Sequence, residues 1–168
     1  MRLKAELAAC KSSDTPEQFK KRLLGLFAEH MPGKTLDDLV CEPSQAREYC
    51  EIVRKDTDLE WMPDVVPLKT LLNIRKKKDC PKGLKRERTN RRLDKRLKDA
   101  GCKMKPDAFR DLLVNAHVDM YKNQTVDNLV CHPREARQLC QFVRNKAKCP
   151  DLSDEMILST LMNVRKAQ

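Results

Sequence analysis

Residues 35–54 read TLDDLVCEPSQAREYCEIVR, and residues 125–144 read TVDNLVCHPREARQLCQFVR. The two stretches lie 90 positions apart, and the same shift aligns residues 1–78 with residues 91–168 without a gap. Of these 78 aligned pairs, 24 are identical. The sequence therefore predicts a tandem duplication, in which two related modules (1–78 and 91–168) flank a linker at residues 79–90.

The apolar residues of the repeated stretch follow the spacing of an α-helix. Ala46, Tyr49, Cys50 and Val53 stand at i, i+3, i+4 and i+7, which places them on one helical face. Pro43 precedes this stripe and ends the short segment that Thr35 caps. We therefore expect a short helix, a proline corner and then a longer amphipathic helix in each module.

Three further helices are predicted in each module. One carries Leu3 and Leu7, and a second opens at Thr15-Pro16, a capping residue followed by proline at the first helical position. The last contains Leu68 and its neighbours, and Pro67 is expected to delay its start. Aromatic residues form only 4% of the chain, so Leu, Val, Ala, Met and Cys must fill the cores. We predict an all-α fold, a tandem duplication of a compact module of about five short helices joined by a basic linker or helix.

The charge excess of the chain is concentrated between the modules. Residues 75–98 contain thirteen basic and three acidic residues, a net charge of +10, which equals that of the whole chain. Such a segment attracts phosphates, because neutralising them releases condensed counterions. We therefore predict a non-enzymatic nucleic-acid-binding protein, DNA or RNA being the ligand. The predicted phosphate-contacting residues are Arg75, Lys76, Lys77, Lys78, Lys82, Lys85, Arg86, Arg88, Arg91, Arg92, Lys95, Arg96, Lys98, Arg165 and Lys166.

The same segment also has a simpler interpretation, a solvated spacer between two modules. The chain would then be a protein-interaction adaptor whose partner protein docks on helical faces, for example on the side around Trp61 and Met62. No aromatic residue stands between Trp61 and Phe109, so any nucleic-acid contact there is expected to involve the backbone rather than stacked bases.

Three arginines are retained in each copy: Arg47, Arg54 and Arg75, and their counterparts Arg137, Arg144 and Arg165. They could form a repeated phosphate or acidic-peptide site. The structural interpretation, which we favour, pairs them with the retained aspartates or with carbonyl groups at helix ends. Those aspartates are Asp37, Asp64, Asp127 and Asp154. Thr70 and Asn73, also retained, are expected to lie off the apolar face and to hydrogen-bond within the module.

No catalytic or metal-binding motif is repeated. The shared cysteines (Cys41 and Cys50, Cys131 and Cys140) have eight residues between them, unlike common zinc pairs, and are expected to pack as small apolar groups. In the second copy alone, Cys131, His132, Cys140 and Cys149 offer four metal-ligand types. No histidine is shared, and we expect His132 to be a helix cap or surface residue. We expect no enzyme activity, no metal and no cofactor.

The sequence also bears on location. No apolar run approaches the roughly 18 residues that span a bilayer, and the N-terminus alternates charge with Leu and Ala. Eight cysteines in a long, charged chain of this kind are expected to be mostly free thiols. We therefore expect a cytoplasmic protein with no membrane partner.

Overall fold

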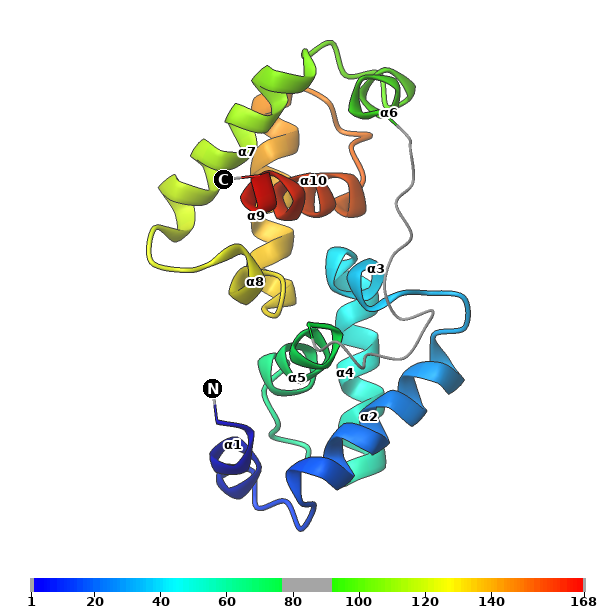
Figure 1. Cartoon of the computed structure of the whole chain (residues 1–168). Coiled ribbons are helices and arrows are strands. Elements are labelled where there is room, and N and C mark those ends of the chain that lie inside the picture. Colours follow the sequence, from blue (N-terminus) through cyan, green and yellow to red (C-terminus); the bar gives the residue numbers. More distant parts are fainter. Residues whose placement is uncertain (1, 77–91, 168) are drawn as a thin grey trace. The chain divides into compact units, whose positions relative to one another are not determined.

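The computed structural model describes residues 2–76 and 92–167, and of residues 165–167 the backbone alone. These ranges contain ten α-helices and no strand, so the expectation of an all-α fold is confirmed (Figure 1). The predicted linker, residues 79–90, lies outside the described residues. The chain divides into two compact units, Met1–Val40 with Ser44–Arg86 (unit 1) and Cys41–Pro43 with Glu87–Gln168 (unit 2).

The first five helices are α1 (Leu3–Ala9), α2 (Pro16–His30), α3 (Leu36–Cys41), α4 (Pro43–Thr57) and α5 (Val65–Arg75). The second five are α6 (Leu93–Asp99), α7 (Pro106–Tyr121), α8 (Val126–Leu129), α9 (Pro133–Ala147) and α10 (Asp154–Ala167). In unit 1, α5 packs against α1 and α2; in unit 2, α7, α9 and α10 pack against one another. The expected short third helix before the proline corner is present as α3 and α8.

The apolar stripes predicted for α4 and α9 form the core of their units. Ala46, Tyr49, Cys50 and Val53 are at most 1% exposed, and so are their counterparts on α9. The buried Tyr49 hydroxyl donates a hydrogen bond of 2.7 Å to the carbonyl oxygen of Leu23. The spacing in the sequence therefore identified the buried face correctly.

The start of α2 is a complete capping box. The Thr15 hydroxyl accepts a hydrogen bond from the Gln18 amide at 3.3 Å, and Oε1 of Gln18 accepts from the Thr15 amide at 2.8 Å. Pro16 follows the cap, where its missing N–H costs nothing. The equivalent start of α7 has Lys105 at the cap, in an extended conformation and with no side-chain capping bond.

The prediction for Pro67 is wrong. Helix α5 begins at Val65, so the proline lies inside its first turn. The first four amides of a helix have no intrahelical acceptor, and a proline there breaks no hydrogen bond. The residue therefore does not delay the helix.

Four helices end in the same backbone turn, in which one residue has a positive φ and the next amide bonds to the carbonyl five residues earlier. The residues with positive φ are Lys11 and Asp58 in unit 1, and Gly101 and Lys148 in unit 2. The amides that follow belong to Ser12, Leu59, Cys102 and Cys149, with hydrogen bonds of 2.9, 3.1, 2.8 and 3.1 Å. This is the Schellman closure of helices α1, α4, α6 and α9.

Candidate nucleic-acid interface

The structure describes the side chains of six of the fifteen predicted phosphate-contacting residues: Arg75, Lys76, Arg92, Lys95, Arg96 and Lys98. The others, Lys77, Lys78, Lys82, Lys85, Arg86, Arg88 and Arg91, lie outside the described residues, as do the side chains of Arg165 and Lys166.

The side chains of Arg75 and Arg96 are engaged within their own units. The guanidinium of Arg75 pairs with the carboxylate of Asp37, and its side chain is only 10% exposed. The guanidinium of Arg96 pairs with Glu155 at the start of α10, with both side chains under a quarter exposed. These two arginines therefore stabilise the fold, and a phosphate would have to compete with their carboxylates.

The remaining basic side chains near α6 face solvent. Arg92, Lys95 and Lys98 are exposed at three-residue intervals, and Lys103 and Lys105 are exposed in the segment that follows. We call these five residues the α6 basic cluster. Asp94 and Asp99 are exposed on the same helix. The five basic residues and these two aspartates together carry a net charge of +3.

The aligned helix of unit 1 lacks most of these charges. Arg2 matches Arg92, but Ala5 and Ala8 stand where α6 has Lys95 and Lys98, and Ser13 and Thr15 match Lys103 and Lys105. Ala5 and Ala8 are exposed, as the two lysines are. Lysine is therefore not required for helix formation at these positions. Lys103 and Lys105 were not among the predicted contacts, although both stand just after the end of α6 in the sequence.

The retained arginines of α4 and α9 have structural partners. Arg54 pairs with Asp64 and donates from Nε to the carbonyl oxygen of Met62 at 2.8 Å. Arg144 pairs with Asp154 and donates from Nε to Leu152 at 2.6 Å. The structural interpretation is confirmed for these arginines and for Arg75. By contrast, Arg47 and Arg137 are exposed on their helices.

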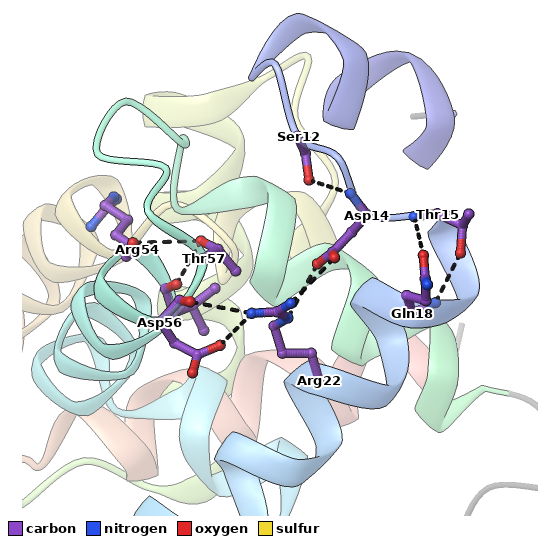
Figure 2. A network of polar contacts seen from close by, with 9 residues as sticks. Ser12, Asp14, Thr15, Gln18, Arg22, Arg54, Asp56 and Thr57 are labelled. Carbon is purple, nitrogen blue, oxygen red and sulfur yellow. Dashed lines mark hydrogen bonds and ion pairs between the residues drawn. The ribbon is translucent and has the colours of Figure 1, made fainter.

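Unit 1 contains an ion-pair network that the sequence comparison did not reveal (Figure 2). Arg22 on α2 contacts Asp14 before that helix at 3.2 Å and Asp56 near the end of α4 at 3.0 Å. It also donates to the Asp56 carbonyl oxygen at 3.2 Å. The network ties the α1–α2 connection to the last turn of α4, two segments more than 30 residues apart in the chain.

No protein-family model, curated protein or solved structure matches this chain. Within residues 2–76 and 92–167, no group of three His, Cys, Asp or Glu side chains is arranged to hold a metal ion, and no helix is both long and apolar enough to cross a membrane.

The cysteines and His132 of unit 2 make local contacts. The Cys131 thiol donates to the Asp127 carbonyl oxygen at 3.2 Å, and burial raises the pKa of the Cys140 thiol, as does the nearby Asp154 carboxylate. His132 occupies the N-cap position of α9, as expected, but its side chain makes no capping bond. Its Nε2 lies 3.5 Å from Nδ2 of the Asn128 side chain.

Three other expectations have mixed outcomes. Thr70 is 2% exposed rather than off the buried face, because α5 is buried on most of its sides; it does bond within the module, to the Val66 carbonyl oxygen at 2.7 Å. Asn73 is exposed. Trp61 is 92% exposed, whereas Met62 is buried in the core and cannot belong to the same surface.

Proposed function

We propose that the chain is a tandem duplication of a five-helix module and that it binds nucleic-acid phosphates through the basic segment between its modules. The α6 basic cluster continues this segment into the second module. In this proposal the ligand is DNA or RNA, the contacts are to phosphate rather than to bases, and no catalysis is involved. The seven free thiols of the described ranges accord with a reducing compartment, and we propose the cytoplasm.

The observation that carries the proposal is the localisation of charge. The entire excess of +10 falls between residues 75 and 98, while the rest of the chain is balanced. A diffuse basic surface would suit solubility alone, but a concentrated one gives a local potential that attracts a polyanion. The exposed Lys95 and Lys98 add to this potential at positions where α1 has alanine.

The pairing of Arg75 and Arg96 narrows the proposed contact set. A guanidinium that already binds a part-buried carboxylate gains little from exchanging it for a phosphate. At α6, the proposed contacts from the predicted set are therefore Arg92, Lys95 and Lys98, which are exposed and spaced along one short helix.

A salt-dependent binding titration tests the proposal. The full chain is titrated into labelled duplex DNA, single-stranded DNA and RNA at about 50 and about 200 mM salt. We expect binding that weakens at least tenfold over this range, since each neutralised duplex phosphate adds about 0.9 to the slope of log K against log salt. No binding to any of the three, or binding insensitive to salt, would sink the proposal.

A second candidate function is favoured by Trp61. Its indole is 92% exposed in the connection between α4 and α5, where no packing within the described residues accounts for it. Tryptophan is enriched where proteins bind one another. If the chain is an adaptor, Trp61→Ala will weaken capture of a partner protein, and neutralising the basic segment will leave that capture unchanged.

A further inference from the structure

Cys102 and Cys149 occupy equivalent turns at the ends of two helices of unit 2. Each follows a residue with positive φ, and each closes its helix, α6 or α9, with a hydrogen bond to the carbonyl five residues earlier. Both are buried, with exposed fractions of 7% and 4%. The turns are adjacent, because Sγ of Cys149 donates to the carbonyl oxygen of Ala100, two residues before Cys102, at 3.0 Å. The Cys102 thiol is also close enough to Cys149 to raise the pKa of the Cys149 thiol.

Unit 1 joins the matching segments by different means. There the α1–α2 connection is tied to the end of α4 by Arg22, which pairs with Asp14 and Asp56 (Figure 2). Unit 2 cannot form this network, because Leu112, Met104 and Lys146 stand at the aligned positions. The cysteine turns themselves align with Ser12 and Leu59, which have the same backbone hydrogen bonds but no sulfur.

We propose that Cys102 and Cys149 form a reversible disulfide that locks the turn after α6 to the turn after α9, under oxidation by a small hydroperoxide such as hydrogen peroxide. This modification is independent of the proposed nucleic-acid function. In unit 2 this disulfide joins the segments that match those joined by the Arg22 ion pairs in unit 1.

The reaction consumes one peroxide for each disulfide. The thiolate of Cys102, the slightly more exposed of the two residues, attacks one peroxide oxygen. The O–O bond breaks, leaving a sulfenic acid on Cys102 and hydroxide, which a thiol proton converts to water. The Cys149 sulfur then attacks the Cys102 sulfur and displaces the second oxygen, which leaves as another water. The two sulfurs lose two electrons and the peroxide gains them.

The surroundings set the conditions for this step. Burial raises the pKa of Cys149, and the adjacent Cys102 thiol raises it further. The thiolate is the reactive form, so disulfide formation is expected to accelerate as the pH rises. The cross-link encloses α7, α8 and α9 in one covalent loop, which restricts the unfolded chain of unit 2 and raises its melting temperature by about 5 °C or more.

Peptide mapping tests the proposal on the full folded chain. The reduced protein is treated with hydrogen peroxide, its free thiols are alkylated, and a tryptic digest is analysed without reductant. We expect the peptide 99–103 to be linked to the peptide 149–165, with the link absent after dithiothreitol. Cys102→Ser, which introduces the residue of the aligned Ser12 turn, and Cys149→Ser are each expected to abolish it.

The proposal requires that the folded structure, and not random collision of thiols, brings Cys102 and Cys149 together. Oxidation of the same protein in concentrated urea provides the control, in which cysteines pair without preference. If Cys102 and Cys149 remain alkylated after peroxide treatment of the folded chain, or pair with other cysteines as often as they do in urea, the proposal is wrong. An unchanged melting temperature in the linked form would equally refute the proposed locking of the two turns.

Discussion

The guanidinium of Arg144 pairs with the carboxylate of Asp154 and thereby joins the end of α9 to the start of α10. Its Nε also donates a hydrogen bond of 2.6 Å to the carbonyl oxygen of Leu152 in the turn between the two helices. Arg54 makes the same two contacts in unit 1, with Asp64 and Met62. One arginine in each unit therefore links the end of one helix, α4 or α9, to the start of the next, α5 or α10.

Arg144→Met is expected to lower the free energy of unfolding by about 2 kcal/mol. The substitution keeps the apolar stem but leaves Asp154, which is about a quarter exposed, without its ion pair, and leaves the Leu152 carbonyl without its donor. Urea unfolding followed by circular dichroism measures the loss. Arg137→Met, on the same helix but exposed, should change stability by no more than about 0.5 kcal/mol. Equal effects of the two substitutions would contradict this role.

The capping box of α2 can be transferred to α7. Thr15→Ala should cost about 1 kcal/mol, because the Gln18 amide loses its acceptor. Lys105→Thr combined with Ala108→Gln builds the same box at a cap that has none, and should stabilise unit 2 by about 0.5 to 1 kcal/mol. Thermal unfolding of both variants checks the pair. A destabilised double variant would show that the start of α7 needs Lys105 for another reason.

Alkaline pH should destabilise the fold. Burial raises the pKa of Tyr49 and of Cys140 above their ordinary values of 10.0 and 9.0. Below about pH 9 both groups are protonated in the folded and unfolded states; above it, the unfolded chain releases these protons while the folded chain retains them. The free energy of unfolding should then fall with pH, by up to about 1.4 kcal/mol per unit for each group. Urea titrations between about pH 8 and about pH 11 measure this slope, and Tyr49→Phe should make it shallower.

Charge removal on α6 tests the binding surface without disturbing the fold. Lys95→Ala combined with Lys98→Ala gives α6 the residues that α1 has at the aligned positions. This double variant should lower the slope of log K against log salt for nucleic-acid binding by up to about 2. Lys21→Ala with Lys55→Ala removes the same charge from exposed positions on other helices and serves as the control. Equal losses in both double variants would mean that net charge alone, and not the α6 basic cluster, determines affinity.

Much of the fold could be predicted because the two aligned parts of the sequence carry local signals. The stripe of α4 and the cap at Thr15 depend on residues within two turns of one another, and the retained Arg54 and Asp64 are close in sequence. The partners that were missed are distant: Arg96 meets Glu155 across 59 positions, and Arg22 meets Asp56 across 34. Neither pair recurs at the aligned positions, so comparing the two aligned parts of the sequence could not reveal them. Thr70 was misplaced because periodicity identifies one buried face, whereas α5 is buried on several.

Trp61, the chain's one tryptophan, has an indole that is already 92% in water. Its fluorescence in the native protein is therefore that of a solvated indole, and unfolding will shift the emission maximum very little. A flat fluorescence signal during heating would say nothing about stability, so circular dichroism must follow unfolding. For the same reason, a blue shift on adding another molecule would be an unusually clean report that something has covered this side chain.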